Sequence, residues 1–287
     1  PSSFAKTDEV IELAKVASEF GGIYDTHIRD ESSYSIGILA AVDEAIQVAQ
    51  EANVHLNISH IKCLGIDVWG YSGEVIAKIE DAQHNGISIS ADQYPYAASW
   101  IHLDRALLPK WVFEEDYDYQ SKLENPELLP EIMMGMKQNL RRRGGAKAIL
   151  ILSAKDEELI GLNLAQISKE WGMSPLRAAL EIMKNGSAAT ASFSLQNADI
   201  QNFMTRDWVM TSSDGTPGHP RKYGAFPRKI REYILDKGIL ELPEMIRKST
   251  SLPAEIFGIP NRGKLKEGYY ADILIFKPEE FKDNSTF

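Results

Sequence analysis

Residues 54–62 read VHLNISHIK, a short apolar strand pattern that ends in a histidine. Two other stretches end in a similar way: GGIYDTHIRDE (residues 21–31) reaches His27, and WVMTSSDG (residues 208–215) reaches Asp214. Histidine nitrogens are common zinc ligands, and an aspartate can bind a metal or act as a base. Three such strand ends predict a metal site at the C-terminal edge of a parallel sheet.

Helical patterns separate the first strand patterns. They cover Thr7–Phe20, Ile36–Ala52 and Gly73–Asn85, and each of them leads into a strand pattern. Alternating helices and strands are typical of a parallel sheet covered by helices. The sequence therefore predicts the α/β class.

The parity of residues 54–60 predicts how this strand is buried. Val54, Leu56 and Ile58 share one face with His60. Branched apolar residues that fill a barrel, with a polar residue at the strand end, give this pattern. We therefore expect the apolar face to point into a barrel.

The alternation of helices and strands fails after Trp100. We expect an insertion or lid at about residues 100–145, followed by strands over Ala146–Ser153 and Ala189–Leu195. The last motif, GKLKEGYYADILIFKP, predicts a turn and a final β-strand.

Composition excludes several classes of protein. A formal net charge of −10 argues against nucleic-acid binding, and the apolar runs are too short to span a membrane. The single cysteine, Cys63, excludes an intramolecular disulfide and favours a reducing, cytoplasmic location. Because the chain starts without methionine, loss of a leader that directs export is an alternative.

The residues alone leave other interpretations open. A single strand-end histidine often has only a structural role, and Ser-Asp-Gly around Asp214 is also an ordinary turn. Arg221 lies in the polar loop after Asp214. Its guanidinium group could bind a substrate carboxylate with two hydrogen bonds, and the alternative is an arginine at the surface without such a role.

Five motifs together carry a resemblance to a known family. They are GGIYDTHIRDE, ISHIKCLG, ISADQYPYAAS (residues 89–99), TSSDGTPGHPRKYGAFPR (residues 211–228) and GKLKEGYYADILIF (residues 263–276). In this order they resemble the D-aminoacylase, or N-acyl-D-amino-acid deacylase, family of the amidohydrolase superfamily. The resemblance implies the C-terminal part of a TIM-like (β/α)8 metal-dependent hydrolase barrel over residues 1–260, and a strand of a small β-sandwich over residues 261–287.

The resemblance also implies a role for individual residues. His27 and His60 match zinc ligands, and Asp214 matches an aspartate that binds metal and acts as general base and acid. Arg221 and Tyr94 match residues that bind the carboxylate and carbonyl of the substrate. Ser99 lies beside a pocket serine of the family, with a spacing that differs by one residue. The cofactor implied is zinc, as one or two ions, and the partner is a small N-acyl-D-amino acid.

One part of the family pattern is missing. The His-x-His pair and the cysteine ligand of the family lie upstream of residue 1, and Cys63 is not that cysteine. We therefore expect an incomplete metal site, with the upstream half elsewhere or the chain self-associating through an open sheet edge. The alternative functions are a cyclic-amide hydrolase of the hydantoinase or dihydropyrimidinase type, and a non-catalytic fragment.

Overall fold

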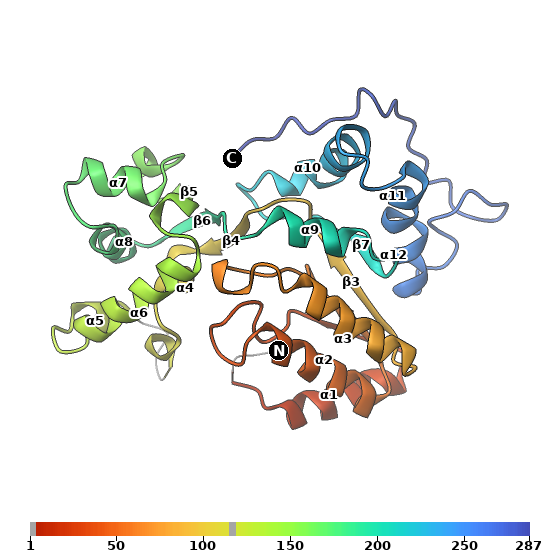
Figure 1. The fold of residues 1–287 in the computed structure, drawn as a ribbon, viewed down its shortest axis with the longest axis horizontal. Helices are drawn as coiled ribbons and strands as arrows, with labels where there is room; N and C mark the ends of the chain where they lie inside the picture. The colour runs from red at the N-terminus through yellow and green to blue at the C-terminus, as the bar shows by residue number, and fades with distance from the viewer. Residues whose placement is uncertain (1–3, 115–118) are drawn as a thin grey trace.

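The computed structural model describes residues 4–114 and 119–287, and its strands form two sheets. The first sheet is parallel, in the order β1-β2-β3-β7 (Figure 1). Its strands are β1 (Ile23–Thr26), β2 (His55–Ile58), β3 (Ile89–Gln93) and β7 (Val209–Thr211). Each strand pairs in parallel register with the next, as Tyr24 with Leu56 and Leu56 with Ile89. The α/β class predicted from the sequence is confirmed.

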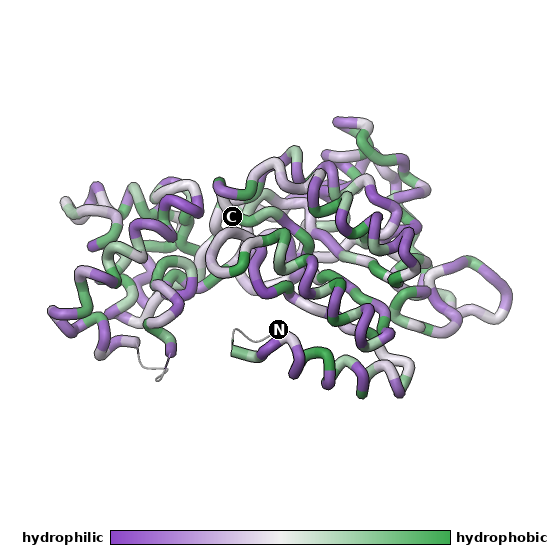
Figure 2. The backbone as a smooth tube through the Cα atoms, turned by 60° about the horizontal axis from the view of Figure 1, so that its bottom comes forward, coloured by the Kyte–Doolittle hydropathy of each residue, from purple (hydrophilic) through white to green (hydrophobic). Residues whose placement is uncertain are grey.

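Helices that alternate with the strands cover one face of this sheet. They are α1 (Thr7–Glu19), α2 (Ile38–Ala52) and α3 (Ser72–His84). Figure 2 shows hydrophobic and hydrophilic residues alternating along these helices, as expected for helices with one buried face. Leu56 and Ile58 are fully buried in one cluster with Val42 and Ile79 of the helices.

The predicted direction of the β2 side chains is wrong, because its apolar face packs against helices. The opposite face is polar. On it, the Asn57 side-chain amide donates hydrogen bonds of 2.9 Å to Asp25 and 3.1 Å to Asp92. Burying Leu56 and Ile58 against α2 and α3 removes their apolar surface from water.

The second sheet is antiparallel and belongs to an inserted layer. Its order is β4-β6-β5, with β4 (Ser99–His102), β5 (Ile149–Ala154) and β6 (Ala188–Ser192). Helices α4 (Leu103–Leu107), α5 (Tyr119–Glu124), α6 (Leu129–Arg142), α7 (Leu164–Glu170) and α8 (Pro175–Lys184) pack around it. Short 3₁₀ helices cover Ile66–Val68, Lys110–Phe113, Ala146–Ala148 and Glu157–Leu159.

The insertion is therefore longer than the predicted 100–145. Of the strands expected after residue 145, β6 hydrogen-bonds to β4 and β5 hydrogen-bonds to β6. Neither joins the parallel sheet, so the inserted layer extends from Ser99 to Ser192. Residues 115–118 of the expected lid lie outside the described residues. This layer has its own buried cluster, which includes Leu107, Ile132 and Ile151.

The chain returns to the parallel sheet after the insertion. It forms α9 (Asn197–Met204), β7, α10 (Arg221–Arg228), the π-helix η5 (Lys229–Asp236), α11 (Leu242–Ser249) and α12 (Ser251–Ile256). Across the described residues, no helix combines the length and apolar character needed to cross a membrane.

Residues 261–287 form no strand, so the final β-strand expected from GKLKEGYYADILIFKP is absent. Figure 1 shows this segment as an extended loop that returns across the top of the molecule. A strand requires a neighbour for its backbone N–H and C=O groups, and none lies beside this segment in the described structure. Its apolar side chains Ile273, Leu274 and Ile275 are exposed by 62%, 69% and 91%.

Candidate metal and substrate site

The C-terminal ends of all four parallel strands open on one cavity of about 740 Å³. His27 follows β1, His60 lies two residues after β2, Tyr94 follows β3, and Asp214 lies three residues after β7. All four line the cavity, together with Arg221 from the start of α10. The structure thus brings together candidates that are widely separated in sequence.

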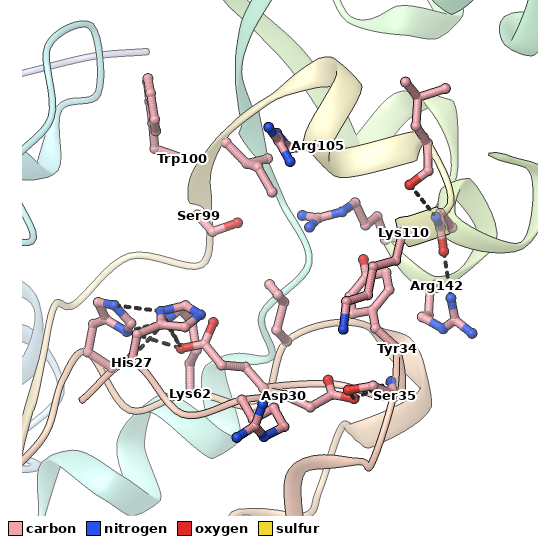
Figure 3. A pocket seen from close by; sticks show the side chains of 18 of the residues that line it. His27, Asp30, Tyr34, Ser35, Lys62, Ser99, Trp100, Arg105, Lys110 and Arg142 are labelled. Carbon is pink, nitrogen blue, oxygen red and sulfur yellow. Dashed lines mark hydrogen bonds and ion pairs between the residues drawn. The ribbon is translucent and has the colours of Figure 1, made fainter. Parts of the chain in front are cut away.

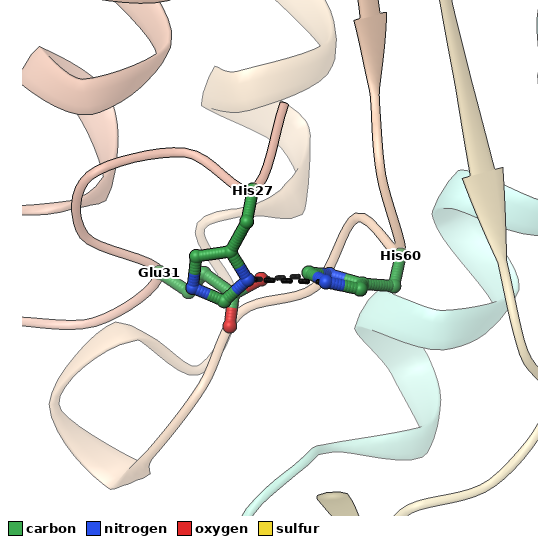
Figure 4. Close-up of side chains that lie close together, drawn as sticks. All are labelled: His27, Glu31 and His60. Atoms are coloured by element: carbon green, nitrogen blue, oxygen red, sulfur yellow. Dashed lines mark hydrogen bonds and ion pairs between the residues drawn. The ribbon is translucent and has the colours of Figure 1, made fainter. Parts of the chain in front are cut away.

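His27, Glu31 and His60 form a group that could hold a metal ion (Figure 4). Their ligand atoms lie within 4.8 Å of one another. Nδ1 of His27 is 3.0 Å from Nε2 of His60, and Oε1 of Glu31 is 3.0 Å from Nδ1 of His60. Two imidazole nitrogens and a carboxylate oxygen are a donor set that zinc accepts. Glu31 was not among the ligands predicted from the sequence, although it lies four residues after His27 in the same motif.

The ammonium group of Lys62 lies against the same ligand atoms. Its Nζ is 2.5 Å from Oε1 of Glu31 and 2.7 Å from Nδ1 of His60. Burial raises the pKa of the Glu31 carboxyl, but Lys62 and the two histidines outweigh it and hold this pKa well below its usual range. The carboxylate is therefore ionised and oriented toward a cation, which fits a metal ligand.

The backbone at His60 explains how this side chain reaches the cavity. His60 has a φ of +43°, in the left-handed region that few residues other than glycine adopt. Its N–H donates a 3.1 Å hydrogen bond to Oδ1 of Asp92, which helps to hold this conformation. Because of this turn, the imidazole does not follow the alternation of side chains along β2, and it points into the cavity. Asp214, with a φ of +44°, leaves its strand by a similar turn.

Asp214 is not a member of the three-ligand group. Its Oδ2 forms a 2.8 Å ion pair with Nη1 of Arg221, whose side chain is only 3% exposed. Nη2 of Arg221 donates to Oγ1 of Thr216 at 3.1 Å, and its guanidinium carbon lies 4.4 Å from the centre of the Tyr94 ring. Stacking and ion pairing hold the guanidinium at the cavity wall.

His219, which was not predicted from the sequence as a site residue, positions the loop that carries Arg221. It is 1% exposed, and its Nδ1 accepts a 3.1 Å hydrogen bond from the backbone N–H of Arg221. Its Nε2 is 3.1 Å from the carbonyl oxygen of Ala98 and donates to it. Burial and the nearby charge of Arg221 lower the pKa of His219 to about 3, so the ring is neutral. It links Arg221 to the residue before Ser99.

Two buried hydroxyl groups at this cavity have no hydrogen-bond partner among the described residues. They belong to Tyr94 and Ser99. Burial raises the pKa of Tyr94 above its usual value, although Arg221 acts in the opposite direction, so the phenol keeps its proton. A buried donor without an acceptor costs free energy, and a bound polar ligand would remove that cost.

Residues 166–285 match the model of the amidohydrolase family. Over this stretch the chain is similar to the amidohydrolase family. It is 31% identical to a D-aminoacylase of Alcaligenes xylosoxydans xylosoxydans, over 100% of this chain and 52% of that protein. An N-acyl-D-glutamate deacylase of the same organism is 28% identical over 100% of this chain and 51% of that protein. The resemblance to the D-aminoacylases is confirmed.

A solved structure gives the same assignment for the fold. It is N-acyl-D-glutamate deacylase from Bordetella bronchiseptica in complex with zinc and a phosphonate inhibitor that mimics the tetrahedral intermediate of the reaction. The TM-score is 0.80 at 27% sequence identity, over 100% of this chain and 53% of that chain. The chain therefore spans about half the length of the relatives that it matches.

Proposed function

We propose that this chain contributes the active site of a zinc-dependent hydrolase that cleaves N-acyl-D-amino acids to a carboxylate and a D-amino acid. One observation carries the proposal. A group of possible metal ligands and the Arg221–Tyr94 pair line the same cavity, at the C-terminal ends of parallel strands. The relatives named as D-amino-acid deacylases support the choice of substrate.

The residues present fit a zinc ion. His27, His60 and Glu31 would hold it through two nitrogens and one carboxylate oxygen, and Lys62 would release Glu31 when the ion binds. When bound, zinc lowers the pKa of water and polarises an amide carbonyl. A role for Asp214 as a further ligand, a second ion and ligands outside this chain remain predictions.

The remaining residues supply proton transfer and binding. Asp214 would take a proton from the attacking water and pass it to the leaving amine. Arg221 would bind the α-carboxylate of the substrate. This substrate group would replace Asp214 as the ion-pair partner of Arg221, and the Asp214 carboxylate would then be free to act as a base. The unpaired hydroxyls of Tyr94 and Ser99 would donate to oxygens of the substrate.

The finer fold assignment belongs to the same proposal. The parallel sheet would be part of a (β/α)8 barrel that occupies residues 1–260, and residues 261–287 would contribute a strand to a small β-sandwich. A (β/α)8 barrel with its active site at the C-terminal strand ends agrees with the position of the cavity. A cytoplasmic location, and association with another copy or with an upstream half of the enzyme, also remain predictions.

Zinc content and hydrolysis test the proposal together. With the upstream half of the enzyme added back, the purified chain should bind zinc and hydrolyse N-acetyl-D-methionine, but neither the L-isomer nor a hydantoin. His60→Ala should abolish both properties, because it removes a ligand from a group of three. The matched control is His84→Ala, which changes an exposed histidine at the end of α3. Retention of zinc by His60→Ala would contradict the site. Absence of zinc and of hydrolysis when the upstream half is present would favour the non-catalytic alternative.

A further inference from the structure

Residues 283–287 lie against the start of α10, although they are far from it in sequence. Figure 1 shows the end of this segment, marked C, between α10 and the strands of the inserted layer. The hydroxyl of Ser285 donates to the carbonyl oxygen of Pro220 at 3.1 Å, and Pro220 directly precedes Arg221. The segment therefore contacts the backbone from which the Arg221 side chain starts.

The ring of Phe287 covers His219, whose Nδ1 accepts the hydrogen bond from the N–H of Arg221. The two ring centres are 4.8 Å apart and the planes lie at 77°, an edge-to-face contact. Phe287 also lies 4.8 Å from the ring of Phe193, which follows β6. Burial is the main cause of the lowered pKa of His219, so the ring above it helps to keep the imidazole neutral and able to accept from Arg221.

The carboxylate of Asp283 connects the same segment to the chain between β3 and β4. It accepts a hydrogen bond from the hydroxyl of Tyr96, and its Oδ1 accepts a 2.8 Å hydrogen bond from the backbone N–H of Ser285. Burial raises the pKa of Asp283, but the hydrogen bonds from Ser285 and Tyr96 outweigh it and lower this pKa below its usual value. The carboxylate is therefore ionised at neutral pH, and its hydrogen bond with Tyr96 is charge-assisted.

Gly224 leaves the space that this contact occupies. It lies inside α10, where alanine is normally more favourable than glycine. A Cβ atom at position 224 would overlap both the Asp283 carboxylate and the Tyr96 hydroxyl. Close packing of residues 283–287 against α10 therefore accounts for a glycine at this position.

The segment and His219 hold the same two parts of the chain together. His219 joins the loop before α10 to Ala98, and Asp283 binds Tyr96, two residues earlier in the same connection between β3 and β4. On the other side, Ser285 and Gly224 make contacts at the start of α10. The segment thus reinforces the link that His219 makes behind Arg221.

Residues 283–287 lie outside the cavity itself. Figure 3 shows side chains that line it, such as His27, Lys62 and Ser99. Of the described residues that line the cavity, none belongs to this segment, whereas Arg221 does line it. An effect of the segment on a ligand in the cavity must therefore pass through Arg221 and its loop.

We propose that Asp283, Ser285 and Phe287 are positioning residues, which fix the loop before α10 and so hold the guanidinium of Arg221 where it binds the substrate. This inference rests on the proposed function, since that function assigns the α-carboxylate of the substrate to Arg221. Without these contacts the loop moves more freely, and Arg221 spends less time at the cavity wall. Substrate affinity then falls, while the groups that cleave the amide stay in place.

Hydrogen exchange of the purified chain tests the contact without relying on activity. Gly224→Ala places a methyl group inside the contact, and Phe287→Ala removes the ring above His219. In both variants the backbone amides of residues 212–224 should exchange at least about tenfold faster, because contacts that oppose local opening are lost. Phe287 is 43% exposed, so Phe287→Ala keeps the test valid if Gly224→Ala does not fold.

Matched variants control for each change. Gly73→Ala adds a methyl group to a glycine of α3 beside which there is room for a Cβ atom. Phe281→Ala removes a ring that packs on Phe276 of its own segment. Both should leave exchange of residues 212–224 unchanged. Phe287→Tyr keeps the aromatic ring and should restore the exchange of the unmodified chain.

Kinetics with the upstream half of the enzyme added back separate positioning from a general loss of folded protein. With N-acetyl-D-methionine, Asp283→Ala and Phe287→Ala should raise KM by about tenfold, while kcat stays within about threefold of that of the unmodified chain. Weaker binding of the carboxylate raises KM, whereas a smaller folded fraction lowers kcat and leaves KM unchanged. Phe287→Tyr should return KM to the value of the unmodified chain.

The possible failures can be told apart. Unchanged exchange of residues 212–224 in both Gly224→Ala and Phe287→Ala would overturn the inference and leave the proposed function standing. A lower kcat with an unchanged KM would do the same, because it would show a structural role only. Absence of hydrolysis by the unmodified chain with the upstream half would overturn the proposed function, and with it the role of Arg221 that the inference uses.

Discussion

The parallel sheet and the inserted antiparallel sheet contribute different parts of one cavity. The parallel sheet provides His27, His60, Tyr94 and Asp214, each just past the end of a strand. The inserted layer provides Ser99 and the arginines of α4 and of the turn after α6. The groups suited to bond cleavage thus lie on one side, and groups suited to recognition lie on the other.

Strand direction explains this difference. Parallel strands all end at the same edge of a sheet, so residues that follow them meet in space. Neighbouring antiparallel strands end at opposite edges, so strand ends in the β4-β6-β5 sheet do not converge. The inserted layer instead contributes side chains through its helices. Reaction type should therefore depend on the parallel sheet, and substrate preference on the insertion.

The largest effect on catalysis is expected at Asp214. Asp214→Asn removes the proton acceptor and should lower kcat by about 10²–10⁴-fold. Asparagine tolerates the left-handed backbone that Asp214 adopts, so the loop should keep its shape. Asp207→Asn, an exposed position before β7, is the matched control. Steady-state kinetics with N-acetyl-D-methionine measure the effect, and a kcat within threefold of the unmodified chain would exclude Asp214 as the base.

The two layers also differ in how well the sequence predicts them. The strand patterns that end at His27, His60 and Asp214 were predicted, because a short parallel strand and its end residue are adjacent in sequence. The pairing of β6 with β4 and of β5 with β6 was not predicted, since it joins segments far apart in the chain. The final strand does not form in the described structure, because it requires a neighbouring strand that this structure does not supply.

The site residues also differ in how well the sequence predicts them. Glu31 and Lys62 were missed because they lie in loops, and only the folded chain shows Lys62 at 2.5 Å from Glu31. The parity argument also placed the apolar face of β2 on the wrong side. His60 reaches the cavity because its positive φ breaks the alternation, and the sequence has no signal for that turn.

Core substitutions test whether the two layers are separate in stability. Leu56 and Leu107 are both fully buried, one in the cluster of the parallel sheet and the other in the cluster of the insertion. Leu56→Ala and Leu107→Ala should each lower the free energy of unfolding by about 2–5 kcal/mol. Hydrogen exchange should show each loss mainly in its own layer. If Leu107→Ala reduced protection equally in β1–β3, the two layers would form one cooperative unit.

The smallest effect is expected at His219, which links the two layers through Ala98 and Arg221. His219→Gln should lower the free energy of unfolding by about 1–3 kcal/mol at pH 7, because glutamine does not reproduce both buried hydrogen bonds. Folding lowers the pKa of His219 from 6.5 to about 3. As the pH falls, His219 therefore becomes protonated in the unfolded chain at a higher pH than in the folded chain. The contribution of His219 to stability is therefore present above pH 6.5 and decreases as the pH falls toward 3.

The difference in stability between the wild type and His219→Gln should consequently become smaller over that range. Urea unfolding at several pH values measures it, with His84→Gln as the exposed control. A difference that stays constant from pH 7 to pH 4 would mean that His219 is not held neutral between the layers. Because both of its hydrogen bonds require a neutral ring, the link between Arg221 and Ala98 would then need another explanation.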